Sequence, residues 1–161
     1  MAKVMEKETV KETTGTTGND LLALLNQQVA NWAVLHIKLH QHHWFVKGPH
    51  FFDLHAKFEE LYNEAGQTMD ELAERILALQ GSPVSTTKEI SAAATVKEHA
   101  PLKSADEMVK SVRDDFKQLI DEIVQAMEVA EKQKDDGTHD MLIGIRTTLE
   151  KHVWMLDAYI K

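Results

Sequence analysis

The sequence contains no cysteine, and this removes every metal site and redox reaction that depends on a thiol. A disulfide framework, a zinc–thiolate site and a redox-active thiol are all excluded, so any bound metal must be held by His, Asp and Glu. Nine histidines are available for that role. The absence of cysteine also suits a reducing cytosol.

Proline, glycine and long hydrophobic runs are scarce as well. The 161 residues include 3 prolines and 7 glycines, and no apolar run is long enough to cross a bilayer. The chain opens with mixed lysines and acids, not with a basic and apolar leader. With 43% apolar residues, typical of globular proteins, we expect one cytoplasmic domain without a membrane partner.

Positive charge is in the minority: 18 Lys and Arg face 26 Asp and Glu, a net charge of −8. An acidic protein repels DNA phosphates unless a basic arm reverses the sign locally. Residues 1–18 offer no such arm, because their lysines alternate with acids before a Thr/Gly-rich stretch. We interpret residues 1–18 as a flexible tail and residues 19–161 as the folded domain.

Apolar residues recur at steps of three and four over four long segments, which predicts helices. The four expected helices run from Asn19 or Asp20 to Gly48-Pro49, from Phe51 to Leu79, from Ala105 to about Gln133, and from a cap at Thr138 to Ile160. Trp32 and Trp154 fall in these helices and are expected in the core.

The connection from Ser82 to Lys103 is long, and a short helical piece is expected near Lys88 to Ala94. Ser104 with Glu107 forms a capping box for the third long helix. A long connection in the middle is what a bundle needs when its second and third helices run parallel. The sequence therefore predicts an all-α fold, a four-helix bundle with a short helix in the crossover between helices two and three.

Histidine and carboxylate side chains gather on one stripe of the second helix. His55 and Glu59 stand four residues apart, as do Asp70 and Glu74, and the three acids lie roughly 40°, 60° and 100° around from His55. However, Glu59 and Asp70 are about 16 Å apart along the axis, whereas metal–ligand bonds are about 2 Å. One helix cannot close such a site.

Two copies of the helix packed antiparallel about a two-fold axis would bring the two pairs together. His43, at the end of the first helix, could add another nitrogen. Such a mixture of imidazole and carboxylate suits iron(II), manganese or zinc. The spacing alone leaves open an ordinary solvated helix face, and also a passive metal buffer without turnover.

A di-iron site inside a single bundle is a different architecture, which needs a Glu-x-x-His motif on each of two helices. The residues three positions before the candidate histidines are His40, Phe52, Val96, Asp136 and Leu149. None is glutamate, so we set this architecture aside.

Three segments carry a family resemblance: His43 to Pro49, Phe51 to His55, and Met69 to Arg75. Together they resemble the signature of the Dps family of mini-ferritins, above all its Bacillus-type stress proteins, and the resemblance covers about Asn26 to the C-terminus. It implies a hollow dodecamer that acts as a ferroxidase. Such a shell oxidises iron(II), preferentially with hydrogen peroxide although dioxygen can serve, stores ferric iron inside and protects DNA from oxidative stress.

The resemblance also implies roles for individual residues. The iron ligands, contributed by two subunits, correspond to His43, His55, Glu59, Asp70 and Glu74, although many members have aspartate at the position of Glu59. Trp44 resembles a tryptophan that absorbs an oxidising equivalent near the centre; packing at an interface is the alternative.

The stretch from Glu131 to Asp140 matches the turn that forms acidic pores in the family. Asp140 is the first candidate for the pore lining, followed by Asp136 and Glu131. The alternative is a solvated acidic turn, because acids are favourable at a helix N-terminus in any case.

Two interpretations remain beside the ferroxidase. His36 and His40 share the face of His43, and we interpret them as interface or surface histidines, not as further ligands. The alternative function is a DNA-binding nucleoid protein with only passive metal binding. Twelve copies would carry about twelve times the net charge of −8, which disfavours direct DNA binding but leaves a route through bridging metal ions or the tail.

Overall fold

The structure, a computed structural model, describes residues 18–161, with side chains from Asp20 onward. The predicted tail lies outside the described residues except for Gly18, which is the first residue of a helix. The helices are α1 (Gly18–Phe45), α2 (Phe51–Ala78), α3 (Thr87–Ala93), α4 (Ala105–Lys132) and α5 (Asp136–Ile160). The part of the chain so described contains helices and connections but no strand, which confirms the all-α prediction.

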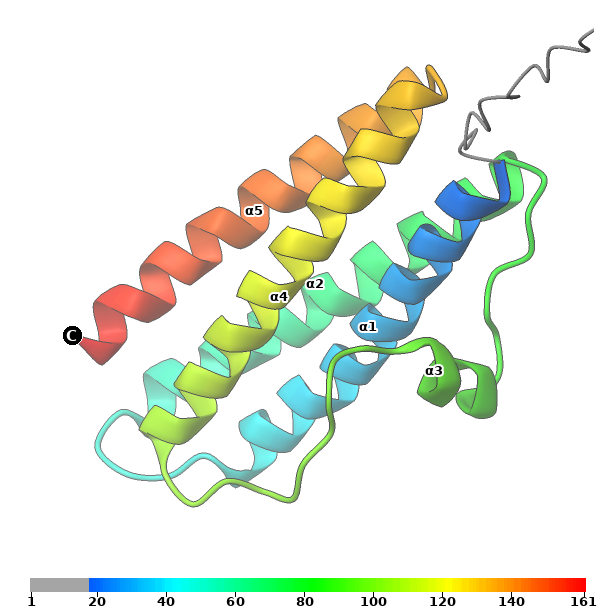
Figure 1. Cartoon of the computed structure of the whole chain (residues 1–161). Coiled ribbons are helices and arrows are strands. Elements are labelled where there is room, and N and C mark those ends of the chain that lie inside the picture. The colour runs from blue at the N-terminus through cyan, green and yellow to red at the C-terminus, as the bar shows by residue number, and fades with distance from the viewer. Residues whose placement is uncertain (1–17) are drawn as a thin grey trace, which may run out of the picture.

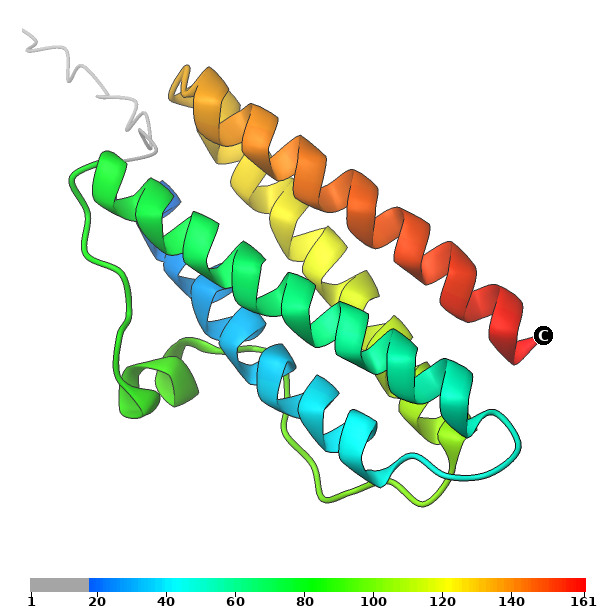
Figure 2. The same cartoon turned by 180° about the vertical axis from the view of Figure 1, so that it is seen from behind.

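The four long helices form two antiparallel hairpins, α1 with α2 and α4 with α5, packed against each other (Figure 1). The crossover after α2 runs the length of the bundle and places α3 beside α1, outside the four-helix layer (Figure 2). The turn between α4 and α5 lies at the same end of the bundle as the start of α1 and the end of α2. This is the predicted four-helix bundle with a short helix in its crossover.

Local signals explain most of the helix ends. The Ser104 side chain accepts from the Glu107 amide while the Glu107 carboxylate accepts from the Ser104 amide, so the predicted capping box is confirmed. Gly48, in the middle of the connection between α1 and α2, takes a φ of +110°, a conformation that only glycine adopts easily.

Two predicted caps are wrong. Helix α1 begins at Gly18, so Asn19 and Asp20 lie in its first turn instead of capping it. Helix α5 is capped by Asp135, whose carboxylate accepts from the Thr138 amide at 3.0 Å, and Thr138 lies inside the first turn. Aspartate and threonine both cap helices. Here the Asp135 carboxylate, three residues before Thr138, accepts from the free Thr138 amide in the first turn.

The core consists of the inward faces of the four long helices. Trp32 is buried as predicted, but Trp154 is 67% exposed, so its assignment to the core is wrong. Helix α5 turns Leu149, His152 and Leu156 inward. Trp154 follows His152 by two residues, about 200° around the helix, and therefore points outward.

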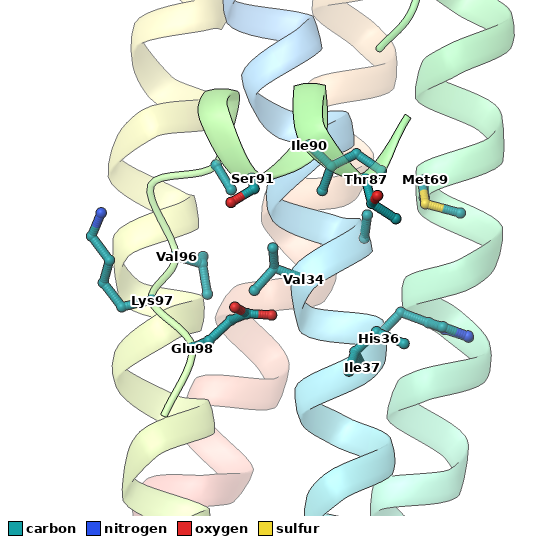
Figure 3. Close-up of a pocket in the computed structure, with 12 residues that line it drawn as sticks. Val34, His36, Ile37, Met69, Thr87, Ile90, Ser91, Val96, Lys97 and Glu98 are labelled. Carbon is teal, nitrogen blue, oxygen red and sulfur yellow. The ribbon is translucent and has the colours of Figure 1, made fainter. Parts of the chain in front are cut away.

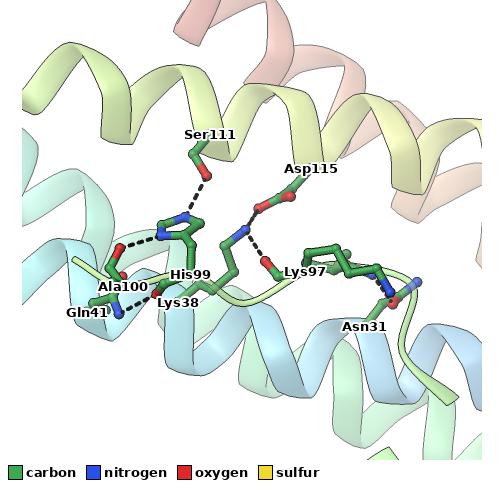
Figure 4. A network of polar contacts seen from close by, with 9 residues as sticks. Asn31, Lys38, Gln41, Lys97, His99, Ala100, Ser111 and Asp115 are labelled. Atoms are coloured by element: carbon green, nitrogen blue, oxygen red, sulfur yellow. Dashed lines mark hydrogen bonds and ion pairs between the residues drawn. The ribbon is translucent and has the colours of Figure 1, made fainter. Parts of the chain in front are cut away.

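A buried polar network attaches the crossover to α1 and α4 (Figure 4). The ammonium group of Lys38 donates to the carboxylate of Asp115 on α4 and to the carbonyl of Lys97 in the crossover. The Gln41 amide donates to the carbonyl of His99, and Nε2 of His99 lies 3.1 Å from the Ser111 hydroxyl. Burial raises the pKa of the Asp115 carboxyl although Lys38 opposes the shift.

Asn31 is the second part of this attachment. Its side-chain oxygen accepts from the backbone amides of Thr95 and Val96 at 2.7 and 3.0 Å, and its nitrogen donates to Glu122 on α4 at 2.7 Å. The side chain is fully buried, so these bonds have no competition from water. Asn31 thus fixes the crossover segment that follows α3.

We expect Asn31→Ala to lower the free energy of unfolding by about 2–4 kcal/mol, because the amides of Thr95 and Val96 lose their buried acceptor. Urea unfolding at a fixed protein concentration measures the change. Gln125→Ala, which removes an amide at an exposed position on α4, is the control and should change stability by less than about 0.5 kcal/mol. Equal effects of the two substitutions would contradict the role given to Asn31.

His42 provides a pH-dependent test of the same core. It is fully buried, neither ring nitrogen has a hydrogen-bond partner, and burial lowers its pKa to about 3. In the unfolded chain the ring binds a proton below about pH 6.5. Between pH 6.5 and the folded pKa of about 3, His42 is protonated in the unfolded chain but neutral in the folded protein. The free energy of unfolding therefore decreases as the pH falls.

We therefore expect the wild-type protein to lose about 2 kcal/mol more of its free energy of unfolding than His42→Leu does when the pH falls from 7 to 5. Urea unfolding at the two pH values measures it. The exposed His50 serves as control through His50→Leu, for which no shift of that size is expected. A difference that stays constant with pH would show that His42 takes up its proton in the folded protein.

Candidate functional site

The structure brings His43 and His55 together where α1 and α2 meet. Their imidazole rings stack with centroids 3.6 Å apart and an interplanar angle of 18°. Nδ1 of His43 lies 2.7 Å from the carbonyl oxygen of His55, and Nδ1 of His55 lies 2.8 Å from the carbonyl oxygen of His43. The two rings are thus held by reciprocal hydrogen bonds between neighbouring helices.

These bonds fix the protonation pattern of both rings. A carbonyl oxygen only accepts, so each Nδ1 must carry the hydrogen, and each Nε2 then has a free lone pair. Neither Nε2 has a hydrogen-bond partner among the described residues, and neither is enclosed as the ring nitrogens of His42 are. A second hydrogen bond that orients the ring in this way is the usual setting of a histidine that binds a metal.

Aromatic rings surround the pair. Tyr62 meets His43 edge-on at 5.3 Å, and Phe51 stacks on His55 at 4.9 Å. Sequence reasoning missed Tyr62, although the signal was present: at 100° per residue it lies about 20° from His55 on the same stripe of α2.

The three predicted acidic ligands do not join the two histidines within one chain. Glu59, Asp70 and Glu74 are exposed on α2, and Asp70 and Glu74 are more than three helical turns from His55. No group of three or more metal-binding side chains forms within residues 18–161 of one chain. The acids are thus presented on the surface of the helix that carries the imidazole.

Large apolar side chains accompany these acids on the surface of the first hairpin. Trp44, near the end of α1, is 64% exposed, and its indole lies 5.3 Å from the ring of His40. Ile37, Phe45 and Leu77 are more than half exposed as well. Such exposure costs free energy in water and is typical of a surface that a partner covers.

The predicted pore residues lie at the turn between α4 and α5. Glu131, Asp136 and Asp140 are all exposed there. Asp135, between them, faces inward instead: it accepts from Arg75 of α2 at 2.7 Å. Burial raises the pKa of Asp135, but the hydrogen bonds from Thr138 and the charge of Arg75 outweigh it and hold the pKa below its usual range.

Within the described residues, no helix combines the length and the apolar character needed to span a membrane.

Comparison with known proteins matches these observations. The chain fits the ferritin-like domain family over residues 22–161. It is 51% identical to general stress protein 20U of Bacillus subtilis over 140 residues, which cover 87% of this chain and 97% of that protein. It is 52% identical to the DNA protection during starvation protein of Brevibacillus brevis over 138 residues, 86% of this chain and 93% of the relative.

Solved structures agree. The crystal structure of Dps from Staphylococcus aureus matches with a TM-score of 0.88 at 50% identity, covering 90% of this chain and 97% of that one. Dps from Listeria monocytogenes matches with a TM-score of 0.85 at 42% identity, covering 87% and 92%. The helical bundle, the sequence signature around the stacked histidines and these matches agree, and the chain belongs to the Dps family of ferritin-like proteins.

Proposed function

We propose that this protein is a ferroxidase that takes up iron(II), oxidises it preferentially with hydrogen peroxide, and stores the ferric product in a hollow dodecamer. The observation that carries the proposal is the pair of stacked imidazoles, His43 and His55, whose Nε2 lone pairs are free while their Nδ1 atoms are held by backbone carbonyls. Iron(II) is the substrate of this site, not a resident cofactor.

The missing carboxylates come from a second chain. His55 and Glu74 stand equally far from the middle of α2, near residues 64 and 65, and so do Glu59 and Asp70. An antiparallel copy of the helix, related by a two-fold axis through that point, places Asp70 and Glu74 beside the His43–His55 pair of the first chain. Each dimer then holds two identical sites, and the exposed apolar side chains of the first hairpin become interface.

The residues divide the chemistry between them. The imidazoles are neutral donors that hold iron(II), and the carboxylates of Glu59, Asp70 and Glu74 stabilise the higher charge of iron(III). Two iron(II) ions give one electron each to a molecule of hydrogen peroxide, whose oxygen–oxygen bond breaks. Water then supplies the oxide and hydroxide of the ferric product, and the protons released leave to solvent.

Several further features follow from this function. Trp44 follows His43 in the sequence, lies 5.3 Å from the ring of His40, and can supply an electron when only one iron is oxidised. Asp140, Asp136 and Glu131 line the entry route for cations at the turn between α4 and α5.

The relatives are named for general stress and for DNA protection during starvation. Because a net charge of −8 disfavours direct DNA binding, we propose that protection comes from removing iron(II) and peroxide together.

A complementation experiment tests the shared site. One variant carries His43→Ala and His55→Ala, and the other carries Asp70→Asn and Glu74→Gln; each alone should oxidise iron(II) no faster than buffer. In a mixed dimer one of the two sites keeps all its ligands, so random co-assembly of equal amounts should restore about one quarter of the wild-type rate. Absorbance near 300 nm follows the ferric product.

Glu71→Gln, which removes an exposed acid of the same helix, is the control and should keep the wild-type rate. If the co-assembled variants stay inactive while size measurements show mixed oligomers, the ligands do not come from two chains. If the wild-type protein itself oxidises no faster than buffer, the protein is a passive metal binder.

The entry route has its own test. Asp140→Asn should lower the initial rate several-fold at low iron(II) and low salt, because a negative lining raises the local cation concentration. The difference should shrink as salt screens the charge. Asp121→Asn, at an exposed position of α4 away from the turn, should leave the rate unchanged. If Asp140→Asn and Asp121→Asn lowered the initial rate equally, Asp140 would have no special role in the entry of cations.

A further inference from the structure

His36 and His40 lie one to two turns before His43 on α1, and backbone carbonyls hold their Nδ1 atoms as they hold those of His43 and His55. Nδ1 of His36 lies 2.8 Å from the carbonyl oxygen of Tyr62, and Nδ1 of His40 lies 2.7 Å from the carbonyl oxygen of His36. Because carbonyls only accept, both Nδ1 atoms carry the hydrogen and both Nε2 atoms keep a free lone pair. Their ring centroids are 4.6 Å apart, and neither Nε2 is enclosed.

Histidines four residues apart on one helix face can hold one metal ion between them. The sequence alone favoured surface or interface roles for these two residues, because spacing gives no information on the tautomer. The structure adds that information, and the tautomer is the one that His43 and His55 share. Tyr62 connects the two pairs, since it stacks on His40 at 3.7 Å and meets His43 edge-on.

The position of His36 on the bundle is the second observation. Its ring packs over Gly66 of α2, where an added Cβ would lie 3.3 Å from the ring atoms Cε1 and Nδ1. Gly66 and Tyr62 flank the middle of α2, the point through which the proposed two-fold axis passes. Gly66 also lies about 20° from His55 on the helix, within the stripe that faces the second chain. The two-fold axis therefore brings the His36 rings of both chains near each other.

Space for a ligand exists beside His36. A cavity of about 530 Å³ opens between α1, α2 and the crossover. Figure 3 shows His36 reaching from α1 toward α2 on one side of it, with Val96, Lys97 and Glu98 of the crossover on the other side. Met69 of α2 also lines the cavity, so the donors on the α1–α2 side are the imidazole of His36 and a thioether sulfur.

We propose that His36 and His40 of two chains together bind one divalent late transition metal, of the class of Cu²⁺ or Zn²⁺, on the two-fold axis. The donors that α1 contributes here are imidazoles alone, a softer set than the mixed imidazole and carboxylate ligands of the iron site, and they favour copper or zinc over iron. This inference depends on the two-fold pairing of the proposed function, but not on iron oxidation. The site is separate from the two iron sites of the dimer and lies between them.

Copper binding to the assembled protein tests the site. Cu²⁺ is titrated into the wild-type protein, into His36→Gln and into a variant with His43→Gln and His55→Gln, and electron paramagnetic resonance reports nitrogen coordination. The wild-type protein should show a nitrogen-bound class of one ion per two chains. His36→Gln should lose at least about tenfold in affinity for that class, whereas the His43 and His55 variant should keep it.

Three outcomes would overturn the proposal: unchanged copper binding in His36→Gln, loss of every nitrogen-bound copper in the His43 and His55 variant, or one ion per chain instead of per two chains. Iron oxidation is measured in parallel and should stay within about twofold of wild type in His36→Gln, because the iron ligands are intact. Sedimentation gives the oligomeric state separately. Copper binding at the predicted ratio in a protein without ferroxidase activity would reject the proposed function and keep the metal site.

A second variant keeps both imidazoles. Gly66→Ala places a methyl group 3.3 Å from the His36 ring and should displace it by a few tenths of an ångström, which weakens copper binding without removing a ligand. Gly144→Ala, whose Cβ would meet nothing within 4 Å, is the matched control. Both substitutions favour the helix to the same extent. Equal copper affinity in the two variants would contradict the packing of His36 over Gly66 as part of the site.

Discussion

Two reciprocal hydrogen bonds between α1 and α2 are the interaction on which the candidate site depends. Each ties the Nδ1 of one histidine to the backbone carbonyl of the other, so the rings of His43 and His55 stack and both Nε2 atoms keep a free lone pair. The bonds also fix the register of the first hairpin at its connection. Since both partners are backbone carbonyls, no change of side chain elsewhere can switch the tautomer, and the donors remain ready for a metal.

The second hairpin and the crossover serve to hold this first hairpin in place. Where the crossover packs against α1, its backbone groups lose contact with water and need a partner. Asn31 and Lys38 of α1 supply these partners for Thr95, Val96 and Lys97, while Glu122 and Asp115 of α4 satisfy the other ends of the same side chains. The exposed acids of α2 stay free of this network and remain available to a second chain.

The sequence predicted the fold well because its signals are local. Apolar periodicity gave four helices, and the capping box at Ser104 gave the start of α4. The stripe on α2 placed His55 and the three acids on one face, as the structure has them. The cap predicted at Thr138 is wrong because the carboxylate of Asp135 accepts from the Thr138 amide. Trp154 is exposed because of its position around α5, which its apolar character alone does not indicate. The missed features, the tautomers and the orphaned His42, depend on contacts between helices and leave no pattern in the sequence.

The two proposed metal sites differ in the donors that the first hairpin offers along its length. Near its connection, imidazoles stand on the same helical stripe as carboxylates, a hard and soft mixture that tolerates both iron(II) and iron(III). Near the middle of α2, where Gly66 leaves room for His36, the donors are imidazoles and the thioether of Met69. In the proposed dimer, a two-fold axis would give two copies of the first arrangement and one shared copy of the second. The proposed symmetry would therefore separate the iron that is oxidised from the metal that stays bound.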